Sequence, residues 1–270
     1  MSAPATPVPA PFIREAGAGP GVVCLHSNAS SSGQWRALME RLAPKFHVVA
    51  PDSYGAGKSP AWPAGRRVML RDEVALIEPA LAMAREPLVL VGHSYGGAVA
   101  LIAAVMQPRR VRALVLYEPT LFALIEAESP SPNDADGIRN AVAAAGRALD
   151  AGDPDGAAEC FIDFWMGKGA WARTPEPRRA TIAASVVNVR GWKDTLFSEP
   201  TPRAAFAALD IPVLYMTGRL SPASSLGVAR LLTKTLPRAE VVQFDGLGHM
   251  GPVTHPEIVN EAIAGFLERL

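Results

Sequence analysis

A serine stands in a sharp turn that the sequence predicts between a strand and a helix. The segment Leu88–Ala104 reads LVLVGHSYGGAVALIAA, so an apolar run leads into GHSYG and small residues follow at once. A strand that turns abruptly into a helix, with glycines on both sides of the turn, is typical of the G-x-S-x-G arrangement of a nucleophilic serine. The free N–H groups of such a helix would face an oxyanion formed beside the hydroxyl. We therefore expect Ser94 to be a catalytic nucleophile.

A serine hydroxyl needs a base to become a nucleophile, and we expect His249 to be that base. It lies in the glycine-rich sequence FDGLGHMGP, directly after the last predicted strand. Glycines give this loop the freedom to bring the imidazole to Ser94, where it can remove a proton and later protonate the leaving group. For His47 and His255 we expect structural roles, and His93 occupies the variable position of the serine motif.

Short apolar runs alternate with helical patterns along most of the chain. The runs are rich in valine and leucine, which suits strands buried on both faces of a parallel sheet. They span Val22–Leu25, His47–Ala50, Leu88–Val91, Val111–Tyr117, Val213–Thr217 and Val241–Phe244. The helical patterns span Trp35–Leu42, Leu70–Ala84, Gly96–Met106, Ser224–Leu236 and Ile258–Leu270. This alternation predicts an α/β fold with a doubly wound, mostly parallel sheet.

The alternation stops between residues 120 and 209. No run in this region resembles a strand, and three of the five tryptophans, Trp165, Trp171 and Trp192, fall within it. We interpret it as a helical cap (lid) inserted before the strand at 213–217; the alternative is a set of core helices with ordinary aromatic packing. The predicted organisation is a flexible, proline-rich leader, a core in two pieces and this cap, which span 1–11, 12–119 with 210–270, and 120–209.

The order of these features resembles that of the α/β-hydrolase superfamily, and the resemblance covers nearly the whole chain. VVCLHSNASSSGQW (22–35) resembles its first buried strand and oxyanion loop, and HVVAPDSYGAGKS (47–59) resembles a second loop of the family. GHSYGG (92–97) resembles its nucleophile elbow, and FDGLGHMGPVTHPE (244–257) resembles its histidine loop. The resemblance implies a serine hydrolase in which His26 braces the oxyanion loop.

The acid that orients the histidine departs from the commonest pattern of the superfamily. That pattern places an aspartate after the strand at 213–217, but the loop here reads GRLSP and holds no carboxylate. Some members, including a subgroup of haloalkane dehalogenases, carry the acid at the end of the preceding sheet strand, where this chain has Glu118. We expect Glu118 to be the acid, because an unpaired carboxylate at the end of a buried strand is costly. Asp245 is the alternative, and Glu118 could instead be a surface residue or pair with Arg219.

Two backbone N–H groups are expected to form the oxyanion hole. One belongs to Tyr95, which follows the nucleophile, and the other to Asn28, in the loop after the first buried strand. For substrate binding we expect Trp165 and Trp192 of the cap. Together with nearby Phe161, Phe164 and Met166 they predict an apolar or aromatic substrate group, although all five could simply form the hydrophobic underside of the cap.

The serine at position 94 argues against haloalkane dehalogenase and epoxide hydrolase chemistry, since both require an aspartate nucleophile in this superfamily. We predict hydrolysis of a carboxylic ester or thioester of a small molecule through an acyl-serine intermediate. Two alternatives use the same triad: hydrolysis of a carbon–carbon bond, with Arg190 holding an acidic tail, and cofactor-free perhydrolysis. An alternative from another class is a ligand-binding protein with little turnover.

Composition narrows the partners. The 26 basic and 26 acidic residues balance to a net charge of zero, which argues against nucleic acid or an anionic membrane as a partner. Cys24 and Cys160 fit no metal pattern, and we expect neither a metal nor another cofactor. The sequence MSAPATPVPAPF lacks the features of a secretory signal, and no stretch suits a membrane span, so we expect a cytoplasmic protein. The sequence makes no prediction about oligomeric state.

Overall fold

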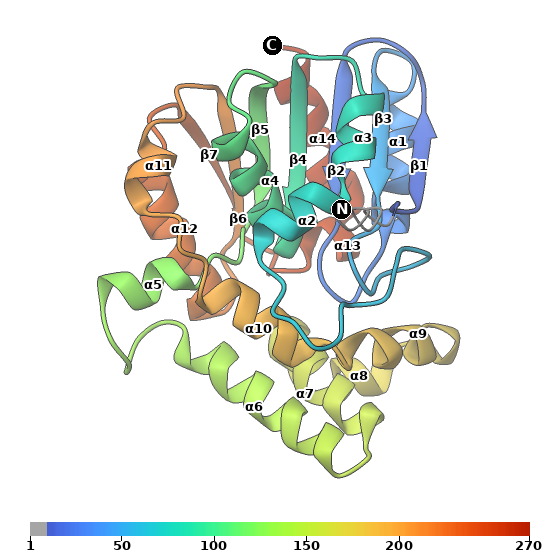
Figure 1. The fold of residues 1–270 in the computed structure, drawn as a ribbon, viewed down its shortest axis with the longest axis vertical. Helices are drawn as coiled ribbons and strands as arrows, with labels where there is room; N and C mark the ends of the chain where they lie inside the picture. The colour runs from blue at the N-terminus through green and yellow to red at the C-terminus, as the bar shows by residue number, and fades with distance from the viewer. Residues whose placement is uncertain (1–9) are drawn as a thin grey trace, which may run out of the picture.

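The computed structural model describes residues 10–270 and folds them around a seven-stranded sheet (Figure 1). The strand order is β1-β3-β2-β4-β5-β6-β7, and neighbouring strands are parallel except β1 and β3. The strands are β1 Ile13–Ala16, β2 Gly21–Leu25, β3 His47–Pro51, β4 Leu88–His93, β5 Val111–Tyr117, β6 Val213–Gly218 and β7 Ala239–Phe244. The predicted α/β class with a doubly wound, mostly parallel sheet is confirmed. Of the predicted leader, residues 1–9 lie outside the described residues.

The edge strand β1 is absent from the prediction. Its four residues, IREA, include two charged side chains and pair antiparallel with β3, with Ile13 opposite Pro51. An edge strand covered on one side only needs no continuous apolar run, so its sequence lacks the signal that marks the buried strands.

Helices cover both faces of the sheet. α1 (Arg36–Leu42) and α14 (Pro256–Leu267) pack on one face, while α2 (Leu70–Leu76), α3 (Glu78–Met83), α4 (Tyr95–Met106) and α12 (Ala223–Thr235) pack on the other. Alternate residues of β2 point to opposite faces. Val22 and Cys24 pack with α1 and α14, while Val23 and Leu25 pack with the helices of the other face. Burial on both faces explains why the central strands are apolar throughout.

The prediction of a single helix over 70–84 is wrong, because the structure has two helices there, α2 and α3. Ile77 ends α2 and precedes α3, and Pro79 occupies the first turn of the second helix. Proline has no N–H to donate and its ring clashes with the preceding turn, so it favours a new helix start over continuation.

A second helical layer lies between β5 and β6 in the chain. Its helices are α5 (Ala123–Glu128), α6 (Asp136–Asp150), α7 (Pro154–Met166), α8 (Ala170–Arg173), α9 (Glu176–Val186), α10 (Val189–Phe197) and α11 (Arg203–Ala207). We call these the inserted helices, and Figure 1 shows α6 to α10 stacked beyond one end of the sheet. A short α13 (Gly251–Thr254) precedes α14. Within the described part of the chain, no helix has the length and apolarity needed to cross a bilayer.

Candidate active site

Ser94 occupies the tight turn between β4 and α4. Its backbone has a φ of 56° and a ψ of −117°, and α4 begins at the next residue. A Cβ on Gly92 would lie 2.5 Å from the carbonyl oxygen of Gly96, and a Cβ on Gly96 would lie 2.2 Å from that of Leu25. Only glycine therefore allows the strand and the helix to approach this closely. The turn leaves the Ser94 side chain beside a cavity, with 6% of the residue exposed.

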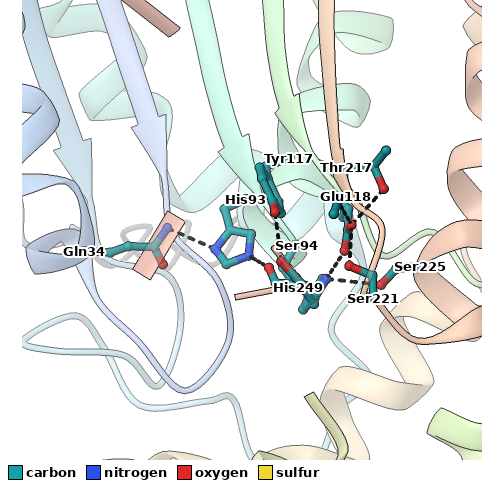
Figure 2. A network of polar contacts seen from close by, with 11 residues as sticks. Gln34, His93, Ser94, Tyr117, Glu118, Thr217, Ser221, Ser225 and His249 are labelled. Atoms are coloured by element: carbon teal, nitrogen blue, oxygen red, sulfur yellow. Dashed lines mark hydrogen bonds and ion pairs between the residues drawn. The ribbon is translucent and has the colours of Figure 1, made fainter. Parts of the chain in front are cut away.

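His249 reaches Ser94 from the loop after β7. Its Nε2 lies 2.9 Å from Ser94 Oγ, and its Nδ1 lies 2.7 Å from Glu118 Oε2, so the three side chains form one continuous line (Figure 2). With Nδ1–H donated to the carboxylate, Nε2 is free to accept the serine proton. The arrangement can therefore deprotonate the hydroxyl and stabilise the resulting imidazolium.

Glu118 follows β5 and is completely buried. Its Oε1 accepts hydrogen bonds from Thr217 Oγ1 at 2.8 Å, from the Gly218 backbone N–H at 2.7 Å and from Ser221 Oγ at 2.6 Å. These donors come from the end of β6 and the loop after it, where the superfamily's commoner aspartate would stand. The site thus replaces that aspartate with a donor cluster that receives a carboxylate from the neighbouring strand.

The charge state of Glu118 follows from these contacts. Burial by itself would raise the pKa of Glu118, but the hydrogen bond and charge of His249, with the bonds from Ser221 and Gly218, outweigh it and lower the pKa. Asp245, the alternative acid, lies at the surface with its carboxylate 3.2 Å from Arg219, and that side chain is 84% exposed. The carboxylate that contacts His249 therefore belongs to Glu118 and not to Asp245. Arg219 pairs with Asp245, and not with Glu118 as the alternative had it.

Backbone strain gathers at this site. Among the described residues, the non-glycine residues with positive φ are Ala29, Ser94 and Glu118, at 55°, 56° and 44°. They lie in the loop after β2, in the serine turn and at the carboxylate. Such conformations are costly for residues with a side chain and commonly mark functional sites.

Both residues that are predicted to supply oxyanion donors lie near Ser94. Tyr95 is the first residue of α4, and Asn28 lines the cavity from the loop after β2. His26 braces that loop, because its Nδ1–H donates to the Ser27 carbonyl at 2.7 Å while its Nε2 accepts the Ser53 N–H at 3.0 Å. The imidazole therefore ties the loop after β2 to the loop after β3.

A second polar chain, which no sequence pattern indicates, joins this loop to the histidine loop. Gln34 Oε1 accepts from the backbone N–H and the hydroxyl of Ser27, and Gln34 Nε2 donates to His93 Nδ1 at 3.1 Å. His93 Nε2–H then donates to the His249 carbonyl at 2.8 Å (Figure 2). Burial, followed by the charge of His249, lowers the pKa of His93 well below its usual value, so this ring stays neutral. No sequence pattern marks Gln34, because its partners come from distant segments.

A cavity of about 400 Å³ opens beside Ser94 and His249. Inserted helices form much of its wall with apolar side chains, which include Ile138, Phe161, Trp165, Met166 and Trp192. Three lining residues are cationic, Arg173, Arg178 and Lys193, and none of the described residues that line it carries a carboxylate. Both predicted tryptophans thus border the space next to the serine. Among residues 10–270, no group of three or more histidine, cysteine or acidic side chains is arranged to hold a metal ion.

Two other residues considered for the substrate lie outside this wall. Phe164 packs edge-on against Trp165, with ring centroids 4.8 Å apart. Arg190 donates to Asp150 at 2.5 Å and to the Gly146 carbonyl at 2.7 Å, and it does not line the cavity. The suggestion that Arg190 holds an acidic substrate tail is therefore wrong, since its guanidinium is already engaged.

The fold and these landmarks define a known class of enzyme. The sequence profile of the alpha/beta hydrolase fold matches residues 20–256, and the chain belongs to this family. It is a hydrolase of the α/β-hydrolase fold.

Similar proteins extend over almost the whole chain. A pimeloyl-[acyl-carrier protein] methyl ester esterase of Xanthomonas campestris is 30% identical and covers 94% of this chain and 97% of its own. The same-named protein of Yersinia enterocolitica is 26% identical and covers 92% and 93%. A solved structure of a thermophilic esterase from Thermogutta terrifontis superposes with a TM-score of 0.76 at 25% identity, over 96% and 93% of the two chains.

Proposed function

We propose that this chain is a serine hydrolase that cleaves a carboxylic ester or thioester through an acyl-serine intermediate. The observation that carries the proposal is the unbroken line from Ser94 Oγ through His249 to the buried Glu118 carboxylate. The names of the similar proteins, which are esterases, support an ester as the bond that is cleaved.

Acylation begins when Ser94 Oγ attacks the ester carbonyl carbon and its proton passes to His249 Nε2. The carbonyl oxygen becomes an oxyanion, which we assign to the backbone N–H groups of Tyr95 and Asn28. As the tetrahedral intermediate collapses, the C–O or C–S bond breaks and the imidazolium protonates the departing alcohol or thiol. A water molecule then attacks the acyl-serine with the same base, which releases the acid and restores the Ser94 hydroxyl.

Glu118 acts on the histidine. Its Oε2 fixes Nδ1–H, which keeps Nε2 available as the base, and its negative charge favours the imidazolium formed in each half-reaction. The donors around Oε1 keep the carboxylate ionised, because they hydrogen-bond to its charged form.

The inserted helices supply the substrate cavity in this proposal. We assign 120–209 as a cap and 12–119 with 210–270 as the catalytic core, with Trp165 and Trp192 contacting the substrate. The apolar wall favours an aliphatic or aromatic acyl or alcohol group. The cations Arg173, Arg178 and Lys193, with no carboxylate beside them in the lining, favour an acidic group on that substrate. A small-molecule substrate and a cytoplasmic location are part of this proposal.

No observation favours the other functions considered. Carbon–carbon bond hydrolysis loses the support of Arg190, which is paired with Asp150. The ligand-binding alternative rested on the lack of an acid in the loop after β6. Glu118 supplies a carboxylate from the neighbouring strand instead, and Gly218 and Ser221 donate hydrogen bonds to it. Perhydrolysis uses the same triad and gains nothing specific from the cavity.

A panel of p-nitrophenyl esters with acyl chains of rising length tests the proposal. We expect turnover that rises with chain length until the cavity is filled, and loss of turnover in the Ser94→Ala variant to the level of buffer. Binding of these esters without release of p-nitrophenol by the native protein would favour the ligand-binding alternative and overturn the proposal.

A further inference from the structure

Trp165 does more than line the cavity, because it stacks directly on His249. The indole and imidazole centroids are 4.0 Å apart, and the two planes differ by 27°. Trp165 belongs to α7 of the inserted helices, so this contact joins the second layer to the histidine loop of the core. The indole is almost completely buried, and the rings of Phe161 and Phe164 pack edge-on against it. These neighbours hold the indole in a fixed plane.

Both nitrogens of the imidazole have polar contacts. Nε2 faces Ser94, and Nδ1 faces Glu118, with Ser225 Oγ 3.1 Å from the same nitrogen. His93 is the nearest other titratable ring, tilted by 47° with centroids 5.3 Å apart. Tyr117 lies against His93, with ring centroids 5.6 Å apart, and its hydroxyl donates to the Gly248 carbonyl of the histidine loop at 2.8 Å.

Neither neighbouring ring supplies a charge. Burial keeps His93 neutral by lowering its pKa, and burial together with the nearby Glu118 carboxylate raises the pKa of Tyr117, so its hydroxyl stays protonated. Among the groups that face the imidazole from the packed elements, Glu118 is therefore the ionised one and Trp165 is the one that offers a π face.

We propose that Trp165 is a positioning residue whose indole face fixes the plane of the His249 ring and stabilises its protonated form. The inference rests on the proposed function, in which His249 becomes an imidazolium in both half-reactions. The face of an indole attracts a cation, and the attraction is stronger between buried groups, as Trp165 and His249 are. The ring edge stays free to exchange its proton with Ser94, because the stack covers only the face.

This assignment makes the inserted helices part of the reaction as well as of substrate selection. A displacement of α7 would separate the indole from the imidazole and weaken the base at the same time as it opened the cavity. A wall residue with no contact to the histidine would affect substrate affinity alone. Trp192 is such a residue, since it borders the same cavity from α10 and packs against Phe161 with centroids 5.6 Å apart.

The test compares Trp165→Leu, Trp165→Phe and Trp192→Leu by measuring kcat and KM against pH on one p-nitrophenyl ester. We expect Trp165→Leu to lower plateau kcat/KM by roughly 3- to 30-fold, mainly through kcat. The acidic limb of its profile should move down by about one pH unit, because the imidazolium has lost its partner. Trp165→Phe should recover part of both effects. Trp192→Leu should raise KM and leave the limb in place.

A second readout needs no turnover and so separates this inference from the proposed function. Protonated imidazole quenches indole emission on contact, so in a Ser94→Ala background the fluorescence should fall as the pH is lowered. That component should disappear when either Trp165→Phe or His249→Gln is added. If it persists in both, or if the Trp165→Leu profile changes only in KM, Trp165 is a wall residue and the proposal is wrong. Absence of ester turnover with this fluorescence behaviour intact would instead refute the proposed function.

Discussion

Replacing Glu118 with glutamine removes one charge and keeps the shape of the side chain. In the native protein three donors, Thr217, Gly218 and Ser221, converge on Oε1. They will hold the amide oxygen of the variant in that position, which leaves the amide NH₂ facing His249 Nδ1. Two donors cannot share that contact, so Nδ1 must accept and the ring proton must move to Nε2. Nε2–H then faces the Ser94 hydroxyl 2.9 Å away and cannot take its proton.

The size of the effect follows from this change of tautomer. An aspartate-to-asparagine change that leaves a protease triad in place but inverts the histidine tautomer lowers kcat by about 10⁴. We expect a fall of roughly 10³- to 10⁴-fold in kcat for Glu118→Gln, which corresponds to about 4–5.5 kcal/mol of transition-state stabilisation. KM should change little, because Glu118 does not line the cavity.

Initial rates with a p-nitrophenyl ester measure this fall, and thermal unfolding shows whether the variant is folded. Asp245→Asn is the matched control, because it also converts a carboxylate to an amide but on the exposed ion pair with Arg219. That variant should retain turnover within about twofold, as is usual for a surface substitution. A Glu118→Gln variant within tenfold of native kcat, or a collapse in Asp245→Asn, would refute the reasoning.

Other variants test a buried carboxyl group, the cationic lining of the cavity and the serine turn. Burial raises the pKa of Glu73 to about 7, so the folded state keeps this proton at higher pH than the unfolded state. The free energy of unfolding of the native protein should thus fall as the pH rises from about 4.5 to 7. In urea unfolding, the free energy of unfolding of Glu73→Gln relative to that of the native protein should rise by roughly 1–3 kcal/mol between pH 5 and pH 8. Arg173→Gln or Arg178→Gln should lower kcat/KM for the half-ester of a dicarboxylic acid by roughly fivefold relative to a neutral ester, since an exposed ion pair contributes up to about 1 kcal/mol. Arg147→Gln is the control, because Arg147 lies on an exposed face of α6. Its ratio of kcat/KM for the half-ester to kcat/KM for the neutral ester should equal that of the native protein. Gly92→Ala would place a Cβ 2.5 Å from a carbonyl oxygen, and calorimetry should show a loss of about 1–3 kcal/mol.

Local signals in the sequence account for most of the core fold. Strands such as β4 are short, apolar and buried on both faces, so their composition alone marks them. The serine turn is equally local, since Gly92 and Gly96 are required by contacts within a few residues and with one neighbouring strand. The approach of Ser94, His249 and Glu118 follows from topology, because the carboxyl ends of parallel strands share one edge of the sheet.

Contacts between distant segments could not be predicted in the same way. The donors Thr217 and Ser221 become informative only when β6 is known to lie beside β5. Gln34 links two loops through His93, and nothing in its own segment indicates that partner. The stack of Trp165 on the histidine depends on how the inserted helices pack, which hydrophobic periodicity does not determine. Composition indicates that residues 120–209 are rich in aromatic side chains, but it leaves open which of them border a cavity and which pack beneath the helices, as Phe164 does against Trp165.

The most direct test of the account is covalent labelling of Ser94 with a fluorophosphonate, followed by mass spectrometry of the peptide that contains it. The reagent reacts with serines that a neighbouring base has activated, so we expect rapid, stoichiometric labelling at Ser94 in the native protein. Labelling should be slower by orders of magnitude in the His249→Gln variant. A folded native protein whose Ser94 stays unmodified, or reacts no faster than it does in His249→Gln, would contradict the claim that this histidine activates the serine.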